Sequence, residues 1–121
     1  MSKLKTSPNN VPLPGQPVRG STSGRPIMAA MDLMGRRWVL RLTWEMRTKP
    51  CGFRELQAAC EGLSPSVLSN RLKELQVAGI VEQTDESLWK LTTLGAELKP
   101  VILSLIEWAD KWAESFGADA D

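Results

Sequence analysis

The sequence contains no histidine and no tyrosine, and only two of its 121 residues are cysteines. Without histidine the chain cannot build a Ser-His-Asp triad, a Cys-His pair or a histidine-ligated metal site. It also lacks a glycine-rich phosphate loop and clustered carboxylates, so no nucleophile, base and oxyanion donor can be assembled. We therefore expect a protein that is not an enzyme and needs no metal or cofactor.

Long apolar runs are missing as well. None approaches the about 20 residues that span a bilayer, and the first ten residues, MSKLKTSPNN, lack the apolar segment of a signal peptide. Two cysteines are too few for the disulfide framework of a small secreted fold. At roughly 100 to 150 residues per domain, the sequence predicts one small domain in a reducing cytoplasm.

The net charge of +1 conceals a strong polarity along the chain. Residues 1–26 carry four bases and no acid, residues 27–84 carry eight bases and six acids, and residues 85–121 carry three bases and eight acids. This distribution predicts one surface that faces an anion and another that faces a partner protein.

Residues 1–26 are predicted to form a disordered tail. Five of the eight prolines lie there among Ser, Thr, Asn and Gly, and so apolar-poor a segment cannot offset its ordering entropy by burial. Its bases fit either an arm that touches DNA phosphates or a solvated leader. Residues 117–121 are expected to be a short acidic tail.

Residues 27–116 place apolar side chains at helical spacing and are predicted to form the folded domain. Cys60 occupies an apolar helical position and is expected in the core, whereas Cys51 beside Gly52 is expected to be exposed. A redox role for either thiol stays open. Helices are predicted over residues 27–35, 37–46 and 53–60, with a long helix from Thr92 or Thr93 to about Phe116.

The strongest local pattern is in residues 64–80. Ser64 is a good N-cap, Pro65 suits the first helical position, and Gly79 suits the left-handed position after a helix. The face toward the core is marked by leucines at i, i+4 and i+7, namely Leu68, Leu72 and Leu75.

The opposite face of this helix carries Ser66, Ser69, Asn70 and Lys73, with Arg71 alongside. Small polar or positive side chains near a helix start are what close approach to base edges in the DNA major groove requires. A polar face that simply meets water is the alternative. The segments IVEQ and LWKL around TDES then alternate like a short hairpin, so the order of elements predicts a mainly helical winged helix-turn-helix.

The runs MDLMGRRWVLRL, CGFRELQAACEGLSPSVLSNRLKELQVAGIVEQ and LTTLGAELKPVILSLIEWADKW together resemble the HxlR-type family of bacterial winged-helix transcriptional regulators, relatives of the MarR regulators. The resemblance implies a homodimer that binds an operator and represses transcription, with residues 65–78 as the recognition helix. It implies base contacts by Ser66, Ser69, Asn70 and Lys73 and phosphate contacts by Arg54 and Arg71. Ser64 and Lys90 complete the residues expected at the DNA.

The sequence departs from this family in two places. Many members carry a Cys-Pro pair before the first helix, where the thiol senses oxidants or electrophiles, but here the pair is Arg25-Pro26. The wing is also short and carries Asp85 and Glu86 at its tip, where carboxylates repel phosphates. A thiol sensor at the first helix and minor-groove contact by the wing are therefore not expected.

The last helix carries an apolar stripe with heptad-like steps of three and four residues. A small domain has little core to cover it, so a second copy is the expected cover, and packing within one monomer is the alternative. Pro100 is predicted to bend or split this helix near Ala96. The residues expected at the dimer interface are Ile27, Met31, Leu98, Val101, Leu105, Trp108 and Trp112.

Two questions about function remain open: whether the tryptophans form an effector pocket, and whether the domain binds DNA or protein. The five tryptophans fit either simple packing or a pocket for a small apolar effector. The domain as a whole fits either an operator-binding regulator or a winged helix that binds protein, which would more often expose apolar side chains on the helix at residues 65–78.

Overall fold

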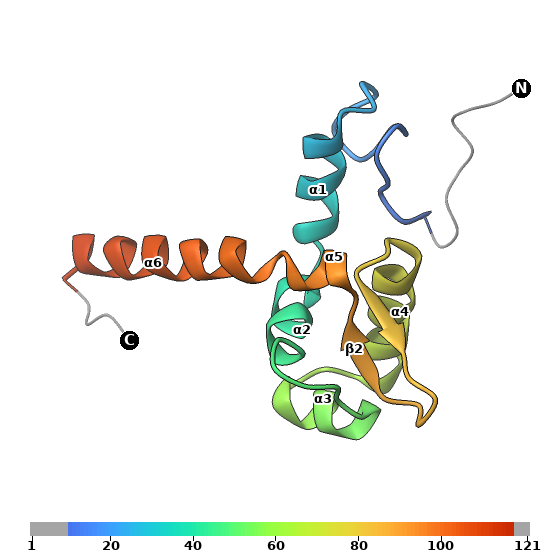
Figure 1. The fold of residues 1–121 in the computed structure, drawn as a ribbon. Coiled ribbons are helices and arrows are strands. Elements are labelled where there is room, and N and C mark those ends of the chain that lie inside the picture. Colours follow the sequence, from blue (N-terminus) through green and yellow to red (C-terminus); the bar gives the residue numbers. More distant parts are fainter. Residues whose placement is uncertain (1–9, 118–121) are drawn as a thin grey trace, which may run out of the picture.

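The structure, a computed structural model, describes residues 10–117 (Figure 1). The fold is mainly helical with one antiparallel hairpin, which confirms the predicted fold class. The elements in chain order are α1 (Pro26–Met34), α2 (Val39–Glu45), α3 (Phe53–Ala59), α4 (Pro65–Val77), β1 (Val81–Gln83), β2 (Trp89–Leu91), α5 (Thr93–Ala96) and α6 (Lys99–Ser115).

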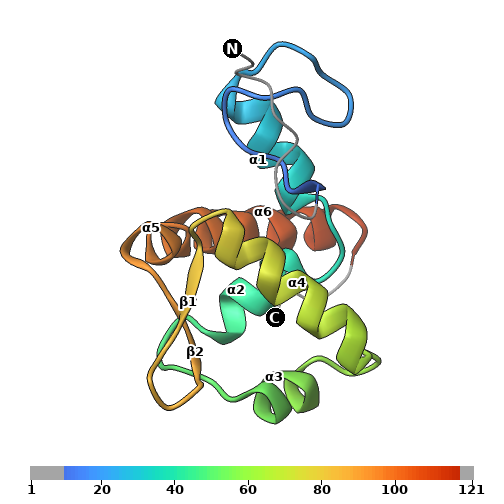
Figure 2. The same ribbon diagram turned by 90° about the vertical axis from the view of Figure 1, so that its right-hand side faces the viewer.

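The core lies between α2, α3, α4 and the hairpin, which surround it in both views (Figures 1 and 2). The inward positions predicted for Cys60 and for the leucines of α4 are confirmed, because each of these side chains is almost completely buried, as is Leu56 of α3, whereas Phe53 at the start of α3 is only half-buried. The buried members from these two helices and the turn after α3 are Leu56, Cys60, Leu68, Leu72 and Leu75.

The ends of α4 follow the predicted capping. The Ser64 hydroxyl accepts a hydrogen bond from the Val67 amide at 3.2 Å, and Gly79 has a φ of 82°. The Ile80 amide donates to the Leu75 carbonyl at 2.9 Å, and the Gly79 amide to the Gln76 carbonyl at 3.0 Å. This is a Schellman ending, so local sequence alone sets the length of this helix.

The hairpin gains a third backbone segment that the sequence pattern did not reveal. Cys51 pairs with Trp89 through two backbone hydrogen bonds of 2.8 Å, beside the β1–β2 ladder. Because of this pairing, Cys51 lies against the β2 strand of the hairpin, and the residue is only 3% exposed. The expectation that Cys51 is exposed was therefore wrong.

The predicted last helix is split as expected from Pro100. Thr92 caps the short α5 through the Gly95 amide at 3.0 Å, and α6 then starts at Lys99 with the proline in its first turn. Helix α6 extends away from the rest of the domain in Figure 1, and Ile102 is its one buried residue. Within residues 10–117, no helix is both long and apolar enough to cross a membrane.

Helix α1 turns different faces to the domain and to solvent. Ala29 and Leu33 are buried, whereas Ile27 and Met31 are about half exposed. Residues 10–25 form a loop whose Arg19 amide donates to an Asp32 carboxylate oxygen at 3.1 Å. The disorder predicted for residues 1–26 is therefore wrong over residues 10–26, because Val11 in this loop is only 2% exposed and Pro26 already belongs to α1. Residues 1–9 and 118–121 lie outside the described part, so the disorder of the first nine residues and the acidic tail over 117–121 stay predictions.

Candidate nucleic-acid interface

The first three turns of α4 expose the polar side chains that the sequence singled out. Ser66, Ser69, Asn70 and Lys73 are all exposed, and together they occupy the side of the helix opposite the buried leucines. The Ser64 and Ser66 hydroxyl oxygens lie 3.4 Å apart at the helix start. The structure thus brings the predicted base-contacting residues together on one accessible surface.

The single acid of α4 is turned away from that surface. Glu74 is 7% exposed, and its carboxylate pairs with the guanidinium groups of Arg36 and Arg71, each at 3.2 Å. Every residue of α4 is described, and none of the exposed ones carries a negative charge. The accessible face of the helix is therefore neutral or positive throughout.

Arg71 lies apart from the exposed polar group. Its Nε donates to the Arg37 carbonyl at 2.8 Å, and its Nη1 donates to both Glu74 oxygens at 3.2 Å. The side chain is 23% exposed. These bonds favour a role in holding α4 in place over the phosphate contact that the resemblance implied.

The other two predicted phosphate contacts differ from each other. Arg54 of α3 is exposed, and no ion pair to its side chain is found within residues 10–117. Lys90 of β2 is paired across the hairpin with Glu82 at 3.6 Å. At the wing tip Asp85 and Glu86 are both exposed, so the wing presents more negative than positive charge.

The predicted dimer residues lie on exposed faces of α1 and α6. Leu98 is half-buried, and the others are 47–57% exposed in this single chain. Trp108 and Trp112 stack with ring centroids 5.4 Å apart, and Phe116 meets Trp112 edge-on at 6.1 Å. Among residues 10–117 only Leu98 and Ile102 anchor this stripe to the domain, and the rest of it is exposed, so the described residues do not pack it wholly within one monomer. The exposed members are Ile27, Met31, Val101, Leu105, Trp108 and Trp112.

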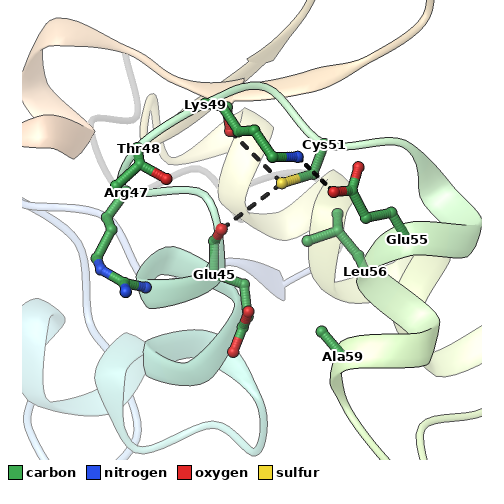
Figure 3. Close-up of a pocket in the computed structure, with 8 residues that line it drawn as sticks. All are labelled: Glu45, Arg47, Thr48, Lys49, Cys51, Glu55, Leu56 and Ala59. Carbon is green, nitrogen blue, oxygen red and sulfur yellow. Dashed lines mark hydrogen bonds and ion pairs between the residues drawn. The ribbon is translucent and has the colours of Figure 1, made fainter.

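A cavity of about 260 Å³ lies between α2 and α3 beside Cys51 (Figure 3). The Cys51 sulfur lies 3.6 Å from the Glu45 carbonyl oxygen and 3.4 Å from the Lys49 carbonyl oxygen, and its one S–H group can donate to either. Burial raises the pKa of Cys51 and of Cys60. Reactive thiols have lowered pKa values, so the environment favours structural thiols.

The charged groups at the rim of this cavity neutralise each other. The Lys49 ammonium and the Glu55 carboxylate form a hydrogen-bonded ion pair, which raises the pKa of Lys49 and lowers the pKa of Glu55. Glu55 also accepts from the Gly52 amide at 3.2 Å. With Glu45 and Arg47, which also line the cavity, its four charged side chains carry two positive and two negative charges, so the formal charge of the lining is zero.

The succession of α2, α3, a capped α4 and a small hairpin defines a winged helix-turn-helix domain. The model of the family described as HxlR-like helix-turn-helix matches residues 33–116. The chain belongs to this family, whose curated relatives are named HTH-type transcriptional regulators.

One such relative is YvaP of Bacillus subtilis, which is 33% identical over 91 residues that cover 70% of this chain and 84% of YvaP. YodB of the same organism is 29% identical over 78% of this chain and 90% of its own. Its quinone-bound crystal structure has a TM-score of 0.67 to this fold, at 30% identity, and covers 70% of this chain and 94% of that one. The reduced form of the redox regulator HypR gives 0.61 at 27% identity, with coverage of 74% and 91%.

Proposed function

We propose that this protein binds an operator in double-stranded DNA as a homodimer and represses transcription, with α4 in the major groove. The observation that carries the proposal is the surface of α4, which exposes small polar side chains and a lysine while its only carboxylate is buried and paired. A helix that enters the major groove needs short side chains at its start and no carboxylate facing phosphates.

The proposed roles follow from exposure and reach. Ser66, Ser69, Asn70 and Lys73 read base edges, and Asn70 has the amide geometry that suits adenine. Arg54 holds a phosphate, because its charge is not neutralised by a neighbour within residues 10–117. Ser64 stands at the amino end of α4, where helix geometry favours a phosphate. Lys90 contributes less, since Glu82 already pairs with it.

The exposed apolar faces of α1 and α6 support the homodimer. Contiguous apolar surfaces of this kind mark interaction sites, and the heptad-like steps along α6 suit another helix of the same kind. Two copies also double the number of α4 helices and of Arg54 side chains that face the DNA. A small apolar effector is the proposed ligand class for the open hollow that Trp112, Ala113 and Phe116 line.

Selection of bound sequences from random duplex DNA by the purified protein tests the proposal. We expect a palindrome with half-sites roughly 34 Å apart, which is one turn of DNA. A reporter gene under the selected operator should be repressed when the protein is expressed. An absence of enrichment would favour a winged helix that binds protein instead.

Two substitutions separate base reading from phosphate binding. Asn70→Ala should change the selected sequence at one position of each half-site, with a loss of about 1–3 kcal/mol there. Arg54→Ala should weaken binding to all duplexes and reduce the slope of log affinity against log salt by about 1 per contact. Arg47→Ala is the matched control, because Arg47 stacks on Trp44 at 3.8 Å near the end of α2. Unchanged operator affinity in both test variants would show that α4 is not the reader.

A further inference from the structure

Four charged side chains meet between α1 and α4 in a largely buried cluster. Arg36 lies 3.9 Å from the Asp32 carboxylate and 3.2 Å from the Glu74 carboxylate. Arg71 donates to the same Glu74. The exposed fractions of the Asp32, Arg36 and Glu74 side chains in these pairs are 6%, 17% and 10%. Two positive and two negative charges balance, so the cluster is neutral as a whole.

Arg36 is the centre of this cluster because it contacts three separate parts of the chain. Besides Asp32 of α1 and Glu74 of α4, its Nη2 donates to the Asn10 carbonyl of the amino-terminal loop at 2.8 Å. Its Nε is buried and makes no hydrogen bond within the described residues. A buried donor without an acceptor lowers the stability of the fold. The other contacts of Arg36 must therefore offset this cost and keep the side chain in place.

Arg71 closes the cluster from the side of α4. Its bond to the Arg37 carbonyl ties α4 to the segment that joins α1 to α2. Buried ion pairs add little net stability, yet removal of one member is strongly unfavourable because it leaves an uncompensated charge. Their best-attested use is to select one geometry among several. The charges and burial of this cluster therefore suit a role in fixing the orientation of α1 relative to α4.

We propose that Glu74, held by Arg36 and Arg71, is a positioning residue that sets the separation of half-sites read by the dimer. The inference rests on the proposed function. Ile27 and Met31 of α1 face the second copy in that proposal, while the start of α4 reads DNA. The second copy contacts α1 and α6, so the separation of the two α4 helices in a dimer depends on the angle between α1 and α4 within each chain as well as on α6. In this proposal Glu74 contacts no DNA.

Glu74→Gln tests this role, because glutamine keeps the size of the side chain and removes its charge. The binding library would hold the half-sites selected by the wild type and vary the spacer one base pair at a time. We expect the wild type to prefer one spacer and the variant to lose at least fivefold of that preference over adjacent spacers. The base preference within each half-site should stay unchanged, since Glu74 lies away from the reading surface.

Glu45→Gln is the matched control. Glu45 pairs with Arg41 within α2 at 2.7 Å, so its loss removes an ion pair without touching the contacts between α1 and α4. This control should keep the wild-type spacer. Arg36→Lys is a second test variant, since lysine retains the charge but offers one nitrogen to the acceptors on three segments. It should broaden the spacer preference as Glu74→Gln does.

The outcomes separate this inference from the proposed function. A folded Glu74→Gln variant with the wild-type spacer preference would overturn the positioning role and leave operator binding intact. A wild type that enriches no sequence would overturn operator binding itself. Circular dichroism checks folding, and loss of folding in both Glu74→Gln and Arg36→Lys would also count against a positioning role, because the leucine core is intact in both.

Discussion

Gly95→Ala is predicted to destabilise the domain severely, although alanine is normally the better helix former. Gly95 lies in α5 against the carbonyl of Ile80, and a Cβ placed on it would lie 2.1 Å from that oxygen and 3.0 Å from its carbon. Both atoms belong to the backbone at the junction of α4 and the hairpin, so no side-chain rotation relieves the contact. Helix α5 must move away instead.

The cost follows from the contacts that hold α5 in place. The Thr92 amide donates to the same Ile80 carbonyl at 3.0 Å, and the Thr92 hydroxyl donates to the Gly79 carbonyl at 2.6 Å. A shift of about 1 Å would lengthen the amide bond beyond hydrogen-bonding distance. Overpacking costs about 1–3 kcal/mol and the lost bond about 1 kcal/mol, so we expect a loss of about 2–4 kcal/mol.

Thermal unfolding followed by circular dichroism measures this effect. For a domain of this size the loss corresponds to a fall in Tm of at least about 8 °C. Gly52→Ala is the matched control, because the added Cβ would lie 3.7 Å from Leu88 Cδ2, an ordinary contact, at a φ of −78°. The control replaces a favoured N-cap residue by alanine, which costs about 0.5–1 kcal/mol, so its Tm should fall by about 2–8 °C and by less than that of Gly95→Ala. A Gly95→Ala variant as stable as the control would refute the packing argument.

Two further predictions concern the dimer and the thiols. Leu105→Glu places a charge in the exposed stripe of α6 and should convert the dimer to a monomer, as measured by sedimentation equilibrium at micromolar concentration. Lys111→Glu, on the polar side of α6, should leave the dimer intact. A monomeric wild type would contradict the dimer proposal. Cys51 and Cys60 should react with iodoacetamide at neutral pH on the order of tenfold more slowly in the native protein than after unfolding, because burial raises the pKa of both. Since the folded-state pKa is the higher one, the stability linked to the neutral thiols is complete below the ordinary thiol pKa of about 8.5 and is lost as the pH rises through the folded-state value. Fast labelling of the native protein would contradict this.

The parts of the fold that were predicted in residue detail depend on short-range chemistry. Ser64 caps α4 and Gly79 ends it through bonds to residues within a few positions along the chain. The break between α5 and α6 likewise follows from the missing amide of Pro100. The groups that form such caps and breaks all lie within a few residues of one another, so the local sequence is enough to predict them.

The features that escaped prediction depend on partners distant in the sequence. Cys51 is buried because its backbone pairs with that of Trp89. Nothing in the sequence near either residue indicates this pairing. Arg71 has a cationic side chain that suits a phosphate, yet its guanidinium donates to the Arg37 carbonyl, 34 positions away, and the nearby Glu74 is buried against it by the packing of Arg36. Residue type alone does not distinguish a charge that faces solvent from one that is held by another element.

The amino-acid sequence by itself determined the class of protein, because helix periodicity, caps and the residue types on α4 are encoded in consecutive residues. Tertiary structure alone decided which surfaces are available for function. It buried Ala29 and Leu33 while exposing Ile27 and Met31 on the same helix, and it turned the one acid of α4 inward onto Arg36. Burial and charge pairing are properties of how elements pack against one another, and that packing is settled by contacts between segments far apart in the chain.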